Sequence, residues 1–331
     1  MKNGTPVAKI SAAAKYLPDH VMTNADLERM VDTSDSWIRE RTGIAERRIA
    51  AEGQTTTDMG ARAANRALAK AGLEPSDVDL IIVTTATPDR WLPSTACEIQ
   101  SRIGASRSSL AFDLHAACTG FLYAVSMAEG YLAAGRGQVV LVVSSEKMSS
   151  ILNWEDRATC VLFGDGAGAV IVQPSENGEG ILSSFHRSDG DMADLLQRPA
   201  GGAARPLDEA GLRNSEHLMQ MSGREVFKSA VRSMAKAGRT VLKEAGLDAD
   251  NVDIMVPHQA NIRIIESTAR YSRIPMEKVF VNLNRYGNIS SATIPVGLDE
   301  AEEEGLIGPG SLVLMTSFGA GLTWGAMAMR W

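Results

Sequence analysis

The sequence contains little cysteine, and the copies it has lie far apart. Cys97, Cys118 and Cys160 are the only three in 331 residues, and no two form a CxxC pair. An odd, widely spaced set argues against a disulfide framework, and without paired Cys or His residues it argues against a structural zinc site. Each cysteine is by default a small buried side chain. Only local context can therefore mark one of them as reactive.

Long apolar runs and excess positive charge are also missing. No apolar stretch approaches the ~18 residues that cross a bilayer, and the N-terminal segment lacks the apolar core of a secretory signal. We therefore expect a cytoplasmic protein with no membrane partner. The net charge is −7, which does not suit binding to a phosphate backbone, so no nucleic-acid partner is expected. The acidic run Asp299–Glu304 is interpreted as a solvated helix face without a chemical role.

Part of the chain recurs about half a chain length later. The residues 71–73 and the apolar run 78–83 match residues 245–247 and 252–256, an offset of 174 (71 to 245, 78 to 252). Each copy has the pattern of a helix end, a glycine cap and a buried strand. Two further pairs occur in the same order at offsets of 169 and 173, namely 112–114 with 281–283 and 140–144 with 313–317. The chain is thus predicted to be a fused duplication.

We place the two halves at residues 1–175 and 176–331, related by a pseudo-twofold axis. Within each half, strands of four to seven apolar residues alternate with segments of helical periodicity. This alternation predicts an α/β protein with largely buried sheets. The one long irregular stretch, 186–222, has the length of a mobile lid or binding loop.

Cys118 differs from the other cysteines in its position. It lies between a predicted strand, 110–114, and an amphipathic helix that begins at Gly120. The N-terminus of a helix carries a partial positive charge that favours thiolate over thiol, and a thiolate is a good nucleophile. Cys97 and Cys160 lack this placement and are interpreted as packing residues.

Three further segments come directly after predicted strands. His258 follows the strand 252–256, and Asn288 follows the strand 279–283. Catalytic residues of α/β proteins often lie at such strand ends, although a structural histidine and a turn asparagine fit the same positions. The stretch 319–321, Gly-Ala-Gly, permits close backbone approach and hence an oxyanion donor, or else a tight turn.

Two familiar patterns do not fit. The glycines of 164–168 suggest a dinucleotide-binding loop, but a strand comes after them where a helix is required. A cysteine protease also uses Cys, His and Asn in this order, but its local signature and its disulfide-bearing context are both missing.

Taken together, the segments resemble the β-ketoacyl-acyl-carrier-protein synthase III family over essentially the whole chain. The resemblance rests on TNADLERMVDTSDSWIRERTGI, AACTGF, FGDGAGA, VPHQANIRII, GNISSATIP and SFGAGLTWGA, in that order. It implies a thiolase fold, in which two pseudo-twofold-related α/β halves form five layers, α-β-α-β-α, and assemble as a homodimer. The same resemblance implies no metal and no cofactor, because acyl-CoA is a substrate.

The resemblance also implies a reaction. Cys118 would take an acyl group from acyl-CoA, with the backbone N–H groups of Cys118 and Ala320 holding the oxyanion. His258 and Asn288 would then donate hydrogen bonds to the thioester of malonyl-acyl-carrier protein as it loses CO₂. The new carbanion would attack the acyl-Cys118 thioester and start a fatty acid.

Further positions match family sites. Residues that would bind CoA are Trp37, Arg41, Arg157, Gly223, Phe227 and Asn261. Leu92 matches a position that closes the acyl pocket of the neighbouring subunit. Basic residues that would bind the acidic carrier protein are Lys228, Arg232, Arg263, Arg270 and Arg273.

Two other functions stay open on the sequence alone. A secondary-metabolite ketosynthase or acyltransferase of the same fold would use another acceptor, and a non-catalytic scaffold would bind acyl groups without a covalent adduct. His115, close to the nucleophile, and Ala320 differ from the usual family residues, so the preferred acyl chain is not fixed by the sequence.

Overall fold

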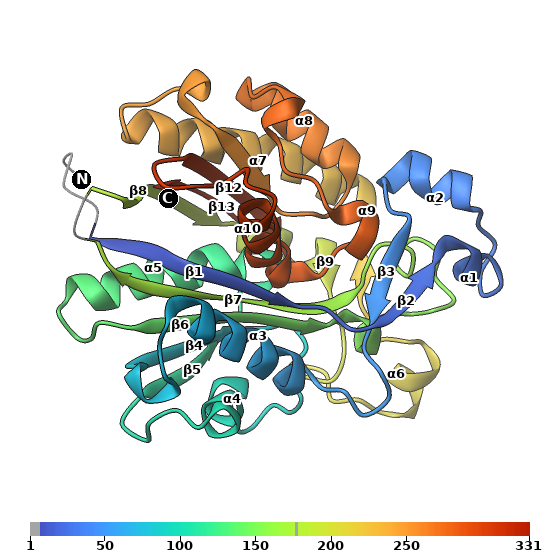
Figure 1. Cartoon of the computed structure of the whole chain (residues 1–331). Coiled ribbons are helices and arrows are strands. Elements are labelled where there is room, and N and C mark those ends of the chain that lie inside the picture. Colours follow the sequence, from blue (N-terminus) through green and yellow to red (C-terminus); the bar gives the residue numbers. More distant parts are fainter. Residues whose placement is uncertain (1–6, 176–177) are drawn as a thin grey trace.

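The computed structural model describes residues 7–175 and 178–331. Two sheets organise the chain (Figure 1). The first has the strand order β1-β7-β6-β4-β5, with the bounds Ala8–Tyr16, Asp165–Pro174, Val140–Lys147, Leu80–Thr84 and Leu110–Leu114. The second has the order β8-β13-β12-β11, with the bounds Gly180–Ser188, Thr323–Arg330, Leu312–Gly319 and Ile254–Pro257.

Helices fill the spaces around these sheets and complete five layers. Helices α3 (Thr56–Ala71) and α4 (Thr95–Ile103) cover the outer face of the first sheet, and α7 (Gly223–Glu244) covers that of the second, with α8 (Ile262–Ser272) beside it. Between the sheets lie α5 (Gly120–Ala133) and α10 (Thr293–Glu303), packed into one core (Figure 1). The predicted α/β thiolase fold is confirmed.

The apolar runs form buried strands because both faces of each sheet are covered. Along β4, Leu80 and Ile82 point into the core between the sheets, whereas Ile81 and Val83 pack beneath α3 and α4. Side chains alternate across a strand, so a strand covered on both faces must be apolar throughout. The same alternation runs along β6 and β12.

The duplication predicted from the sequence is visible in the topology. Strands β1, β7, β6 and β4 have their counterparts in β8, β13, β12 and β11, in the same order and directions. Equivalent aspartates repeat one contact: Asp79 accepts from Val139 N–H at 3.0 Å, and Asp253 accepts from Leu312 N–H at 2.7 Å. The predicted boundary adjoins residues 176 and 177, which lie outside the described residues, so the limits 1–175 and 176–331 stay a prediction.

One predicted strand is mostly absent. Of residues 279–283, only Val279 pairs with the second sheet, through a bridge to Met255. The chain then turns into the short helix α9 (Leu283–Tyr286), which ends the strand. In the irregular region 186–222, β9 (Leu196–Gln197) pairs with β10 (Gln220–Met221), and α6 (Glu209–Arg213) lies between them in the chain.

A small N-terminal unit carries α2 (Asp35–Thr42) beside α8. It also contains α1 (Asn24–Glu28) and the hairpin of β2 (His20–Thr23) and β3 (Glu46–Ile49). Arg47 of β3 is fully buried and donates to Val161 O at 2.9 Å and Asn24 Oδ1 at 2.9 Å. The bond to Val161 holds the hairpin against the segment that precedes Gly164, and the bond to Asn24 holds it to α1. Together they position the N-terminal unit that carries α2.

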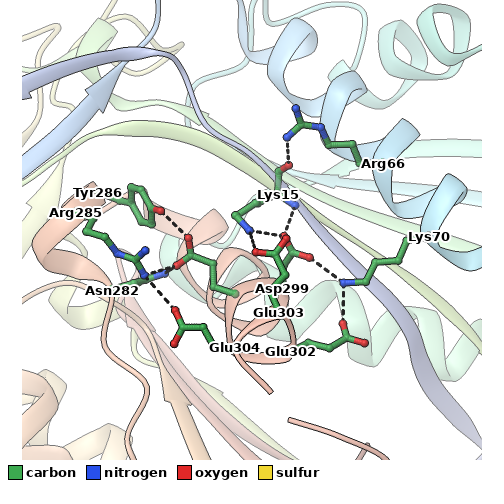
Figure 2. Close-up of polar contacts among 11 residues, drawn as sticks. Lys15, Arg66, Lys70, Asn282, Arg285, Tyr286, Asp299, Glu302, Glu303 and Glu304 are labelled. Atoms are coloured by element: carbon green, nitrogen blue, oxygen red, sulfur yellow. Dashed lines mark hydrogen bonds and ion pairs between the residues drawn. The ribbon is translucent and has the colours of Figure 1, made fainter. Parts of the chain in front are cut away.

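The interpretation of Asp299–Glu304 as a solvated face is wrong for its first two residues. Asp299 is buried and accepts from Lys15 Nζ of β1 at 3.0 Å and Lys70 Nζ of α3 at 2.9 Å (Figure 2). Glu300 is buried too, and its contacts are with Asn282 Nδ2, Arg285 Nη2 and Tyr286 Oη. Helix α10 lies between the sheets, so Asp299 and Glu300 face protein, whereas Glu303 and Glu304 at its end are exposed.

We expect Asp299→Ala to lower the free energy of unfolding by about 3 kcal/mol, because it removes the one buried carboxylate that pairs with both lysines and leaves Lys15 and Lys70 only the more exposed Glu303 and Glu302. Urea denaturation measures this directly. Glu304→Ala is the control, since that exposed carboxylate should contribute no more than about 1 kcal/mol. Equal effects of the two substitutions would contradict a structural role for the buried pair.

Candidate active site

A cavity of about 400 Å³ lies between the two halves. Its wall contains Cys118 from the first half and His258 and Asn288 from the second. The region predicted as a binding loop contributes residues of 196–202 and 219–221 to the same wall. Most of the remaining lining is apolar, including Met148, Phe163 and Phe318.

Cys118 lies in the 3-10 turn η2 (Ala117–Thr119), between β5 and α5. Its carbonyl oxygen accepts from Ser317 Oγ of β12 at 2.8 Å, a contact that crosses from one half to the other. A Cβ on Gly319 would lie 2.8 Å from Cys118 N. Glycine at 319 therefore lets the end of β12 approach the nucleophile, as the sequence suggested.

The expected stabilisation of the Cys118 thiolate is not found. Burial raises the pKa of the Cys118 thiol to about 12, and the carboxylate of Glu146 adds to the effect. A hydrogen bond with Ser290 Oγ, 3.6 Å from Cys118 Sγ, acts in the opposite direction. Removing a group from water penalises its charged form, and here that penalty exceeds the opposing effect of the hydrogen bonds. The resting side chain is a thiol, so forming the nucleophile requires a base.

His258 follows β11 directly and is buried. Its N–H donates to Thr316 O at 2.8 Å, and its Nδ1 lies 2.7 Å from Thr293 Oγ1. Burial lowers the pKa of His258 to about 3, so the imidazole is neutral near pH 7. A neutral imidazole can accept a proton at one nitrogen while the other contacts Thr293.

Asn288 is held by backbone contacts on both sides. Its N–H donates to Leu162 O at 2.8 Å, and its carbonyl oxygen accepts from Gly164 N–H at 3.2 Å. Its side-chain Oδ1 accepts from Ser290 N–H at 2.8 Å. Because Oδ1 is occupied, the amide group offers its NH₂ end as the available donor.

The second half has its own counterpart of the nucleophile. The turn η7 (Ser290–Ala292) precedes α10 as η2 precedes α5, and Ala117 and Ser290 share left-handed φ angles of 44° and 50°. In this alignment Ser291 matches Cys118. Ser291 Oγ donates to buried Glu146 Oε1 at 2.6 Å. The same position of the duplicated unit therefore holds a buried, hydrogen-bonded serine in the second half and a thiol that lines the cavity in the first half.

The residues predicted to bind CoA fall into two adjoining groups. Gly223, Phe227 and Asn261 line the cavity. The guanidinium carbons of Arg41 and Arg157 lie 5.0 and 5.2 Å from the centre of the Trp37 ring. Asn261 Nδ2 donates to Arg41 O at 3.1 Å and links the two groups.

Other predicted positions lie outside the cavity. Leu92 is 85% exposed, whereas its neighbour Trp91, which the sequence did not single out, belongs to the lining. The predicted carrier-protein residues are all exposed on two helices that pack together: Lys228 and Arg232 on α7, and Arg263, Arg270 and Arg273 on α8 and its C-cap. Ala320 lines the cavity beside Gly319.

Sequence reasoning missed Ser290 and Thr293, although both lie in the GNISSATIP segment. Their only signal was the presence of hydroxyl residues next to a candidate asparagine. His115, noted as unusual, also lines the cavity. Within residues 7–175 and 178–331, no group of three or more His, Cys, Asp or Glu side chains is placed to hold a metal ion. In the same ranges no helix has the length and apolar character needed to cross a bilayer.

Two stacked α/β halves around a buried cysteine, histidine and asparagine define a condensing enzyme of the thiolase fold. The family model described as 3-oxoacyl-[acyl-carrier-protein] synthase III matches residues 112–190, and its C-terminal companion matches 242–331. The chain is 50% identical over 327 residues to beta-ketoacyl-[acyl-carrier-protein] synthase III of Natranaerobius thermophilus, covering 98% of this chain and 99% of the relative.

Solved structures agree with this match. The 3-oxoacyl-[acyl-carrier-protein] synthase III of Aquifex aeolicus VF5 has a TM-score of 0.90 and 48% identity, covering 98% of this chain and all of the other. The priming beta-ketosynthase of the R1128 polyketide pathway has a TM-score of 0.91 and 32% identity, covering 100% and 98%. The chain belongs to the 3-oxoacyl-[acyl-carrier-protein] synthase III family.

The raised pKa of Cys118 predicts how its reactivity depends on pH. With a pKa of about 12, the thiolate fraction grows about tenfold for each unit of pH below that value. Alkylation of Cys118 by iodoacetamide should therefore accelerate continuously from about pH 7 to about pH 10. Peptide mass spectrometry separates this adduct from one at exposed Cys97. A rate that levels off near neutral pH would mean that the cavity stabilises the thiolate instead.

Proposed function

We propose that the protein starts fatty-acid synthesis as a β-ketoacyl-acyl-carrier-protein synthase III. It transfers an acyl group from acyl-CoA to Cys118 and then condenses that group with malonyl-acyl-carrier protein, with loss of CO₂. The observation that carries the proposal is the convergence of Cys118, His258 and Asn288 on one largely apolar cavity. No cofactor takes part, because both substrates arrive as activated thioesters.

In the first half-reaction His258 acts as the base. Its Nε2 takes the Cys118 proton while the sulfur forms a bond to the thioester carbon of acyl-CoA. The backbone N–H groups of Cys118 and Ala320 hold the resulting oxyanion. The bond from carbon to the CoA sulfur then breaks, and the proton on His258 passes to the departing thiolate. The acyl group remains on Cys118 as a new thioester.

In the second half-reaction the neutral His258 carries its ring proton on Nε2, with the Thr293 hydroxyl turned to donate to Nδ1, and His258 and Asn288 both act as neutral donors. They hydrogen-bond the thioester oxygen of malonyl-acyl-carrier protein, and negative charge collects on that oxygen as CO₂ leaves. The enolate carbon attacks the acyl-Cys118 carbonyl, and the Cys118 sulfur departs as a thiolate that takes up one proton from solvent. Asn288 suits this role because an amide donates at any pH. His258 suits it because its burial keeps it uncharged.

Two groups of residues, one beside the cavity and one in its wall, support a binding route for acyl-CoA. The stacked group of Trp37, Arg41 and Arg157 provides an aromatic face and two cations, the chemistry that binds an adenine with phosphates. Gly223, Phe227 and Asn261 continue from it into the cavity and would contact the pantetheine arm. The five exposed basic residues on α7 and α8 provide a local positive surface for the acidic carrier protein.

We also propose a homodimer in the cytoplasm. Strand β5 is an edge strand among the described residues, and Leu110 on it is 53% exposed. An exposed edge with apolar side chains favours pairing with another chain. Leu92, itself exposed, would then reach the acyl pocket of the partner. A cytoplasmic location is supported by the three cysteines, all of which are free thiols.

A priming ketosynthase of secondary metabolism is the second candidate. Its support is the likeness to the R1128 enzyme, which has the same fold at 32% identity. Identification of the product with fatty-acid malonyl-acyl-carrier protein present and absent separates the two functions. Condensation with that carrier protein supports the first candidate, and acyl transfer without condensation supports the second.

The covalent step is testable by intact mass spectrometry. Incubation with acetyl-CoA and a panel of longer or branched acyl-CoA primers should add one acyl mass, and Cys118→Ala should abolish it. Cys97→Ala is the matched control and should acylate normally. Asn288→Ala should still acylate but condense at least about a hundredfold more slowly, because it loses one donor to the enolate. An adduct that survives Cys118→Ala would contradict the mechanism.

The dimer is testable by sedimentation. Leu110→Glu places a charge on the edge of β5 and should raise the dimer dissociation constant at least about tenfold. Leu306→Glu is the control, because Leu306 is equally exposed, at 50%, but lies beyond the end of α10. If both variants remain dimeric, the interface lies elsewhere.

A further inference from the structure

Ser290 contacts Cys118 and Asn288 directly and is linked to His258 through Thr293. It begins the turn η7, is 1% exposed and lines the cavity. Its φ angle of 50° is left-handed, which a residue other than glycine adopts only at a cost. Such backbone conformations concentrate at functional sites and persist where surrounding contacts require them.

The backbone of Ser290 orients the two residues of the second half-reaction. Its N–H donates to Asn288 Oδ1 at 2.8 Å. Its carbonyl oxygen accepts from Thr293 Oγ1 at 3.1 Å, and that hydroxyl lies 2.7 Å from His258 Nδ1. One peptide segment therefore fixes the amide of Asn288 and, through Thr293, the ring of His258.

The side chain of Ser290 faces two other groups, the buried Glu146 carboxylate and Cys118. Its Oγ lies 3.6 Å from Cys118 Sγ, within the usual range for a hydrogen bond to sulfur. The matching residue in the first half is Ala117, which has no hydroxyl. Since the turns η2 and η7 pack against each other, the hydroxyl on the second-half turn faces the nucleophile.

We propose that Ser290 is a fourth catalytic residue, whose hydroxyl stabilises the Cys118 thiolate in both half-reactions. In the resting site the thiol proton points toward Ser290 Oγ. When His258 Nε2 takes that proton, the Ser290 hydroxyl rotates and donates to the negative sulfur as it attacks the acyl carbon. The same bond assists when the sulfur departs after condensation. The inference rests on the proposed function for its acyl-transfer step, but not for its effect on the thiol itself.

Ser290→Ala tests the role, because it removes Oγ and leaves the N–H and the carbonyl oxygen in place. Alkylation of Cys118 by iodoacetamide and acylation by acetyl-CoA should both slow by about tenfold. Decarboxylation of malonyl-acyl-carrier protein by the unacylated enzyme should change less than about twofold, because His258 and Asn288 keep their orientation. The apparent pKa of the Cys118 thiol, read from the pH dependence of alkylation, should rise.

Two further variants give this experiment its controls. Ser290→Gly also lacks the hydroxyl but accepts the left-handed backbone without strain, so it should behave like Ser290→Ala. Ser109→Ala removes a buried hydroxyl of similar kind, one that donates to Val78 O at 2.5 Å. Ser109 is not part of the cavity wall, and its substitution should leave Cys118 alkylation unchanged.

The outcomes separate the inference from the proposed function. Unchanged alkylation in both Ser290 variants would overturn the inference, as would an equal fall in alkylation and decarboxylation, which would indicate a merely structural residue. If the unmodified protein accepts no acyl group, the proposed function fails. The alkylation result would then still decide whether Ser290 acts on the Cys118 sulfur.

Discussion

The site depends on the contact between two equivalent turns, η2 and η7, at the centre of the molecule. The turn η2 follows β5 and the turn η7 follows α9, and each begins a helix of the middle layer. When the two sheets stack through α5 and α10, the turns meet, and Cys118 faces residues encoded about 140 to 170 positions later. Duplication of one α/β unit therefore supplies both the nucleophile and its partners, with neither half sufficient alone.

Burial determines the protonation states of Cys118 and His258 where the two turns meet. The same apolar wall raises the pKa of Cys118 to about 12 and lowers that of His258 to about 3, so both are uncharged at rest. Charge then arises only with substrate present, first on sulfur and later on the enolate oxygen. Ser290 is positioned to donate a hydrogen bond to the negative sulfur, and we propose that His258 and Asn288 donate to the enolate oxygen. In a buried and largely apolar cavity, neutral oriented donors avoid the cost of burying a charge.

Local periodicity in the sequence was enough to predict the strands that carry two of the site residues. Cys118 and His258 were placed correctly after strands, because both β5 and the fully buried β11 are largely apolar in sequence. The strand before Asn288 was overestimated, since its continuation into α9 depends on tertiary packing. Asp299 was assigned to solvent because no local signal reveals that a helix lies between two sheets. The thiolate expectation counted the helix terminus but not the depth of the cavity, and the contacts of Ser290 and Thr293 needed coordinates.

The central claim is that the resting site holds a neutral thiol beside a neutral imidazole from the other half. A nuclear magnetic resonance titration of labelled His258, from about pH 5 to about pH 8, tests it most directly. We expect a neutral imidazole throughout, with no titration of His258 in that range. An imidazolium signal near neutral pH that disappears in Cys118→Ala would instead show a thiolate–imidazolium pair and would contradict the account.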